Sequence, residues 1–193
     1  MMVSFATRRF RMKFVAFFRN VNLGRLHSPN KAQLEAAFLQ AGAASAASFL
    51  VNGTLVFDTT GGRARARRLL ADAHQLLVQQ CGLKEPAFLR SVKELAQHVA
   101  SDPFAQVKPG SVYACCISFL PDGCTVPAEV PRTSSRKDVS LLQVAGADVF
   151  SLSYKPGNSP GSPNAYLEKQ LGHPASTRVW NTVVRLVAKH GQA

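Results

Sequence analysis

The chain has 193 residues, of which 46% are hydrophobic and 18% are charged. This composition excludes a disordered chain, and a chain of this length can bury roughly 70% of its unfolded surface without disulfides. Lys and Arg number 23 against 11 acidic residues, which gives a formal net charge of +12. Such a balance favours polyanionic partners, namely nucleic acid or a phosphorylated small molecule. No apolar run reaches the ~20 residues of a membrane helix, so we expect no membrane association.

The first half of the chain has the pattern of a split βαβ unit. Residues 1–11 are expected to form a flexible extension, and 12–190 a single compact α/β domain. Asn52-Gly53 lies between two β-rich runs and is the strongest short hairpin signal. We expect strands over 13–18, 49–51, 55–57 and 86–89, and helices over 28–42, 63–80 and 91–100. The order β-α-β-β-α-β is the ferredoxin-like unit.

The second half repeats this order in degenerate form. We expect strands over 111–120, 139–144 and 147–154, and helices over 164–171 and 177–190. Three prolines in 121–137 prevent a long helix there. The predicted fold class is therefore α/β (α+β), with a mixed sheet built from two ferredoxin-like halves at about 12–100 and 101–190. The second half is expected to lack its last strand and to end in a helix.

The four cysteines and five histidines show no metal-ligand spacing. We therefore predict no metal and no cofactor. Free cysteines are typical of a reducing compartment, and no apolar signal segment begins the chain, so a cytoplasmic location is expected.

The loop after the first strand and the predicted hairpin supply the first candidate site. In a ferredoxin-like unit the first strand ends at the edge where the hairpin turns, so Arg19, Asn20 and Asn22 would face Asn52-Gly53-Thr54 across that edge. Such polar groups could hold a phosphate or carboxylate. The alternative is ordinary loop chemistry, in which asparagines form turns and Gly24 supplies a positive φ.

The last predicted helix supplies further candidates. Trp180, Val183 and Val187 have the spacing of a buried stripe. Arg178 and Asn181 then fall in the first turn, where an arginine opposes the helix dipole unless a carboxylate or a ligand holds it. Pairing of Arg178 with Glu168 is the alternative to a ligand. The candidate ligand-binding residues are thus Arg19, Asn22, Gly24, Asn52, Gly53, Arg178 and Asn181.

A cluster of arginines at the start of the second helix is the candidate polyanion patch, comprising Arg63, Arg65, Arg67 and Arg68. A solvated helix face whose long side chains shield apolar neighbours is the alternative interpretation. The sequence contains no P-loop, nucleophile elbow or dinucleotide-binding motif, and it identifies no catalytic residue.

Several stretches resemble the domain-of-unknown-function 1697 family. They are F-F-R-N-V-N-L-G-R at 17–25, N-G-T-L-V-F at 52–57, R-S-V-K-E-L-A-Q-H-V-A-S-D-P-F at 90–104, and Y-L-E-K-Q-L-G-H-P-A-S-T-R-V-W-N-T-V-V-R-L at 166–186. The resemblance implies a mixed α/β domain with ferredoxin-like halves and no assigned activity. It places the family's motif positions on Arg19, Asn22, Gly24, Gly53, Arg178, Trp180 and Asn181. Asn20, Arg25, Asn52, Thr54 and Val179 depart from the family pattern.

Three functions are compatible with the sequence. The chain could bind nucleic acid or another polyanion, it could hold a small anionic ligand with or without catalysis, or its motifs could serve only the fold.

Overall fold

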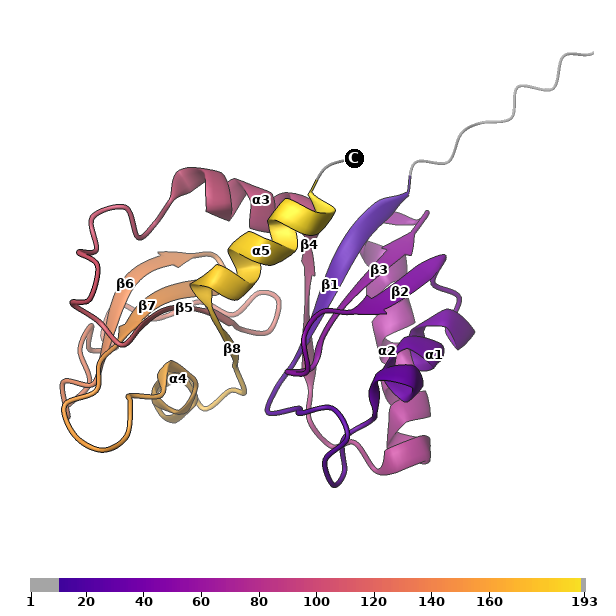
Figure 1. Ribbon diagram of the computed structural model, residues 1–193, viewed down its shortest axis with the longest axis horizontal. Helices are drawn as coiled ribbons and strands as arrows, with labels where there is room; N and C mark the ends of the chain where they lie inside the picture. Colours follow the sequence, from indigo (N-terminus) through magenta and orange to yellow (C-terminus); the bar gives the residue numbers. More distant parts are fainter. Residues whose placement is uncertain (1–10, 192–193) are drawn as a thin grey trace, which may run out of the picture.

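The computed structural model of the protein describes residues 11–191 (Figure 1). Its first half has the strands β1 (Met12–Phe18), β2 (Ser45–Ser48), β3 (Thr54–Thr59) and β4 (Ala87–Ser91) and the helices α1 (Lys31–Gln40), α2 (Gly62–Cys81) and α3 (Val92–Ser101). The strands form an antiparallel sheet in the order β2-β3-β1-β4. This is the ferredoxin-like arrangement, and α3 is added after it.

The second half has the same strand order. Its elements are β5 (Ala114–Phe119), β6 (Val139–Ala145), β7 (Asp148–Ser153), α4 (Pro163–Leu171), β8 (Ser176–Val179) and α5 (Trp180–His190). The four strands form a second antiparallel sheet in the order β6-β7-β5-β8. An irregular loop joins β5 to β6 at the place where the first half has α1. Each half therefore ends in a strand followed directly by a helix.

The α+β class and the ferredoxin-like halves are confirmed, while three details of the expectation are wrong. The strand expected over 49–51 is instead β2 at Ser45–Ser48, which has no β-branched or aromatic residue to mark it, and 49–53 form the turn before β3. The last strand of the second half is present as β8, and it occupies part of the expected helix 177–190. The expected mixed sheet is instead two sheets in which every pair of strands is antiparallel. Apart from Arg11, the extension expected over 1–11 lies outside the described residues.

The inner faces of the two sheets share one apolar core. Phe17 of β1 and Phe119 of β5 stack with ring centroids 3.9 Å apart, and both are fully buried. Val15, Ile117 and Phe150 lie in the same cluster. Because alternate residues of a strand face opposite sides, the neighbouring Phe14, Ala16 and Phe18 pack outward beneath α1 and α2. The sheets are thus held face to face by the inward residues of each strand.

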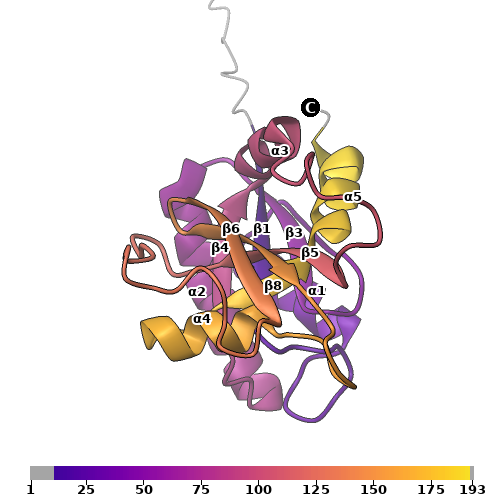
Figure 2. The same cartoon turned by 90° about the vertical axis from the view of Figure 1, so that its left-hand side faces the viewer.

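Helices α3 and α5 cover one end of this shared core, side by side (Figure 2). Helix α3 begins without a turn because Ser91, the last residue of β4, is its N-cap and forms a capping box with Glu94. Helix α5 follows β8 equally directly, and Trp180 begins it by packing on Phe104 and Phe150. Strand and helix are therefore rigidly joined at both β4–α3 and β8–α5.

Candidate functional site

Each half contributes one buried arginine to the space between the sheets. Arg90 lies on β4 and Arg178 lies on β8, and their exposed fractions are 4% and 6%. Both occupy the edge strand of their sheet and point toward the opposite half. The guanidinium of Arg90 lies over the ring of Phe119, and that of Arg178 lies over the ring of Phe17.

Arg178 binds backbone carbonyls of the first half. Its Nη2 donates to the carbonyl oxygens of Phe18 at 2.8 Å and Asn52 at 2.7 Å, and its Nη1 donates to the carbonyl of Thr177 at 2.9 Å. Its Nε donates to the hydroxyl of Thr54 at 2.9 Å. The arginine therefore joins the end of β1 to the β2–β3 turn, and it satisfies carbonyls that are costly to bury alone.

Arg90 makes matching contacts with the second half. Its Nη2 donates to the carbonyls of Leu120 and Ala147, each at 3.0 Å, and its Nη1 donates to the carbonyl of Leu89 at 2.7 Å. Its Nε donates to a carboxylate oxygen of Asp148 at 2.6 Å. Leu120 is the residue after β5, Ala147 lies in the β6–β7 turn, and Leu89 directly precedes the arginine. The carbonyls around Arg178 likewise come from the end of a central strand, from a hairpin turn and from the residue before the arginine.

Strand register shows that the two arginines are equivalent positions of the two halves. Arg90 pairs with Val15 of β1, and Arg178 pairs with Ile117 of β5. By the same criterion Thr54, opposite Phe17, corresponds to Asp148, opposite Phe119. The residue that accepts from Nε is thus a hydroxyl in one half and a carboxylate in the other.

The charge of Arg178 therefore has no partner. No ion pair to it is found among residues 11–191, whereas Arg90 pairs with Asp148. Burial lowers the pKa of Arg178 to about 10, because the charged guanidinium loses its hydration and gains no counter-charge. A buried cation of this kind is stabilised by any anion that approaches it.

A polar cavity of about 320 Å³ opens beside Arg178. It is lined by Asn20, Val21, Asn22, Asn52, Asn164, Thr177 and Arg178. The side-chain oxygen of Asn52 accepts from Thr54, which leaves its amide N–H groups directed elsewhere. Asn164 is engaged by Glu168 and Thr177. The walls thus carry amide donors, and apart from Arg178 no lining residue is titratable.

The predicted ligand-binding residues are brought together only in part. Asn22, Asn52 and Arg178 line this cavity, and the carbonyl of Gly53, in the hairpin turn, accepts from Nη2 of Arg178 at 3.3 Å. Gly53 has φ +64°, and a Cβ there would lie 2.7 Å from the Cβ of Val21, so the close approach of the two loops requires glycine.

Three of the predicted residues lie elsewhere. The guanidinium of Arg19 is taken up by Glu168, at 2.5 and 2.8 Å, and by Glu85 at 2.6 Å. Gly24 lines a different cavity, and Asn181 is exposed on α5. The helix-dipole argument for Arg178 was wrong, because this residue lies on β8 and α5 begins at Trp180.

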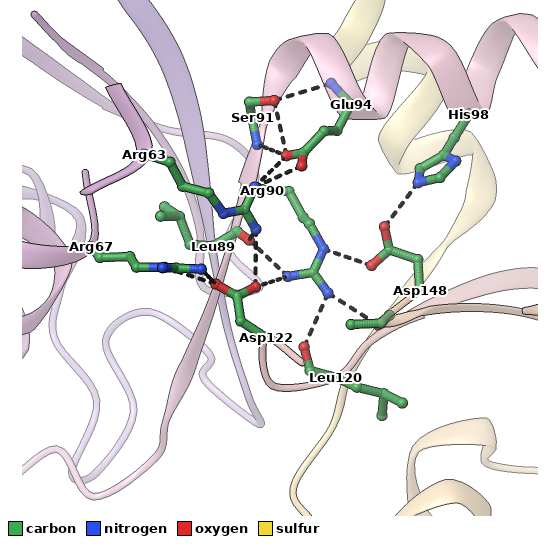
Figure 3. A network of polar contacts seen from close by, with 11 residues as sticks. Arg63, Arg67, Leu89, Arg90, Ser91, Glu94, His98, Leu120, Asp122 and Asp148 are labelled. Carbon is green, nitrogen blue, oxygen red and sulfur yellow. Dashed lines mark hydrogen bonds and ion pairs between the residues drawn. The ribbon is translucent and has the colours of Figure 1, made fainter. Parts of the chain in front are cut away.

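The arginine cluster of α2 is divided by its contacts (Figure 3). Arg63 pairs with Glu94 and Asp122, and Arg67 pairs with Asp122. Arg65 lies against the turn at Gly42, and Arg68 is exposed. Half of the predicted polyanion patch is therefore neutralised by acids, one of them from the second half.

Sequence reasoning missed Arg90, Asp148, Asn164 and Thr177. Arg90 and Arg178 lie at the same step of equivalent strands, and this correspondence was the signal that could have found them. This correspondence between Arg90 and Arg178 can be recognised in the sequence only when β8 is identified as a strand. Among residues 11–191, no group of three or more His, Cys, Asp or Glu side chains is placed to hold a metal ion. Within the same residues, no helix has the length and apolar character needed to cross a bilayer.

These features define a class of α+β protein in which two ferredoxin-like halves are joined by reciprocal buried arginines. The chain matches the family described as "Protein of unknown function (DUF1697)" over residues 12–150 and belongs to that family. This confirms the resemblance, although the motif at 166–186 lies beyond the matched range.

The same fold occurs in a solved structure, described as the conserved bacterial protein SP0830 from Streptococcus pneumoniae. The TM-score is 0.67 and the sequence identity 13%, over 95% of this chain and 100% of that chain. At that identity the likeness concerns the fold alone. No curated protein matches the chain.

Arg19 is testable as a structural residue. We expect Arg19→Met to lower the free energy of unfolding at pH 7 by about 1.5–3 kcal/mol, because two carboxylates lose a charged donor. Arg19 holds the pKa of Glu168 below its usual value, so the stabilisation is present above that value and is lost as the pH falls through the lowered pKa. Denaturant titrations at pH 7 and at an acidic pH would measure both effects.

The exposed Arg25→Met in the same loop is the matched control and should change stability little. A difference between wild type and Arg19→Met that is equally large at both pH values would contradict this account.

Proposed function

We propose that the cavity beside Arg178 binds a small anion, a carboxylate or a phosphate group carried by a small molecule. The observation that carries the proposal is a buried guanidinium without a counter-charge at the wall of a polar cavity. The equivalent guanidinium, Arg90, has its counter-charge built in as Asp148. A ligand would supply at Arg178 what the chain supplies at Arg90.

Arg178 contributes charge rather than hydrogen bonds. Its Nε, Nη1 and Nη2 already donate to protein oxygens, and these bonds hold the two halves together. The direct donors to a ligand would be the amide groups of Asn20, Asn22 and Asn52. Because the guanidinium is already buried, an anion bound to these neutral donors gains its attraction without any further desolvation of the cation.

The size and chemistry of the cavity favour binding over catalysis. A volume of about 320 Å³ is at the lower end of ligand pockets and suits a small metabolite. The lining holds no carboxylate, histidine or cysteine that could act as acid, base or nucleophile. Recognition of an anionic group is therefore the function that this geometry supports best.

The test is to supply the missing counter-charge from the protein. Thr54→Asp places a carboxylate where Asp148 stands relative to Arg90, and we expect it to abolish the binding of phosphate and of acetate. In wild type, saturating anion should stabilise the fold by about 2.7 kcal/mol at a hundred times the Kd. Titration calorimetry and melting temperature at constant ionic strength would measure both effects.

Thr60→Asp makes the same change at an exposed position after β3 and should leave anion binding intact. Asn22→Asp at the cavity wall, with the helix N-cap variant Asn30→Asp as its control, gives a second pair that does not alter the core. Equal anion affinity in wild type, Thr54→Asp and Asn22→Asp would refute the proposal.

Nucleic-acid binding is the second candidate. None of the ion pairs found among residues 11–191 involves a lysine, and the lysines of this range are exposed except for the half-buried Lys13, which donates to the carbonyl of His190. Arg65 and Arg68 of the predicted polyanion patch are also outside those pairs. Changing both to Gln should reduce the slope of log K against log salt for single-stranded RNA by about 1.4, as two phosphate contacts are lost. An unchanged slope, or no binding at low salt, would exclude this patch.

A further inference from the structure

Near Arg90, away from the cavity at Arg178, three arginines converge on the carboxylate of Asp122 (Figure 3). Arg67 donates through Nε at 2.9 Å and Nη2 at 2.6 Å to one oxygen of Asp122. Arg63 donates to the other oxygen at 2.9 Å, and Arg90 approaches that same oxygen at 3.4 Å. We name Arg63, Arg67 and Arg90 the arginine cradle.

Asp122 occupies the cradle from an irregular loop. It lies between Pro121 and Gly123 in the segment from β5 to β6, where the first half has helix α1. Connections of this length without regular structure are uncommon in compact domains and often carry function. The side chain of Asp122 is 32% exposed, whereas Asp148 on β7 is 7% exposed. Glu94, whose side chain is 39% exposed, is fixed on helix α3, so Asp122 is the exposed carboxylate of the network that a loop holds in place.

The charges identify what Asp122 contributes. Arg90 is balanced by Asp148 at 2.6 Å, and Arg63 is balanced by Glu94 at 2.6 Å. Asp122 therefore balances Arg67, whose side chain is 55% exposed. Arg63 and Arg67 hold the pKa of Asp122 below its usual value. Without Asp122 the cradle would carry one uncompensated charge.

The cradle offers more donors than one carboxylate can use. Both N–H groups of Arg67 are directed to a single oxygen, and Arg90 reaches the other oxygen only at 3.4 Å. A cavity of about 370 Å³ adjoins Asp122 and extends to Gln97 and His98. Glu94 and Asp148 also line it, each already paired with an arginine of the cradle. A phosphoryl group has three terminal oxygens, one for each guanidinium, and arginine forks match phosphate geometry.

We propose that the arginine cradle is a second anion site, that it takes the phosphoryl group of a phosphomonoester, and that Asp122 is an internal stand-in which this ligand displaces. The adjoining cavity would hold the rest of the ligand. The loop after β5 thereby gates the site, because binding requires Asp122 to leave the cradle. This site is separate from the cavity at Arg178 and does not depend on it.

Removal of the stand-in tests the proposal. In the Thr54→Asp background, which blocks the cavity at Arg178, Asp122→Asn should raise the affinity for inorganic phosphate at pH 8 at least tenfold by titration calorimetry. Adding Arg67→Met should return the affinity to that of the background. Circular dichroism would verify the fold of each variant. Should Thr54→Asp fail to fold, Asn22→Asp replaces it as the background, and the same Asp122→Asn and Arg67→Met variants are compared there.

Asp72→Asn is the matched control, since Asp72 is exposed on α2 and its loss changes the net charge equally. It should alter the affinity less than twofold. The proposal is overturned if Asp122→Asn gains no more than Asp72→Asn, or if the gain survives Arg67→Met. Because the cavity at Arg178 is blocked in every sample, neither outcome bears on the first proposed site.

Discussion

Two buried arginines, each fixed to backbone carbonyls of the opposite half, organise the structure. Arg178 holds the end of β1 and the β2–β3 turn, and Arg90 holds the end of β5 and the β6–β7 turn. The stacked rings of Phe17 and Phe119 lie between these two contacts. The carbonyls would otherwise be buried without donors, so neither sheet can move from its partner without exposing or orphaning them. The relative placement of the halves follows from this reciprocity.

The two buried arginines differ in their charge partners, and the proposed function depends on that difference. Asp148 and Thr54 hold equivalent places, yet only Asp148 neutralises its arginine. The end at Arg90 is further enclosed by Asp122 and by His98, whose ring contacts Asp148 at 2.8 Å. The cavity at Arg178 is lined by amide side chains and holds no carboxylate. One scaffold thus presents one buried arginine that the chain neutralises and one that it does not, so the two ends of a repeated fold differ in how an anion could bind to them.

The sequence predicted the first half apart from β2, because the signals of the other elements are local. Asn52-Gly53 marks the hairpin, and helices α1 and α2 end near glycines. Strand β8 was missed because Ser176–Val179 runs into α5 without a turn, so its four residues read as the start of the helix. The residues Asn22, Asn52 and Arg178 could be chosen from motif and topology. The acids that hold Arg19 could not, since Glu168 lies 149 residues away and no local pattern links them. The role of Arg90 depends on a pairing between halves that only the fold reveals.

The central claim, that Arg178 lacks a counter-charge which an external anion supplies, is tested most directly by locating an anion. Crystals of the protein soaked in bromide can be measured at the bromine absorption edge, where the anomalous signal identifies the ion without ambiguity. The account predicts a bromide in the cavity bounded by Asn22, Asn52 and Asn164, and none at the contact between Arg90 and Asp148. Bromide confined to surface lysines, with no ion in the cavity beside Arg178, would contradict it.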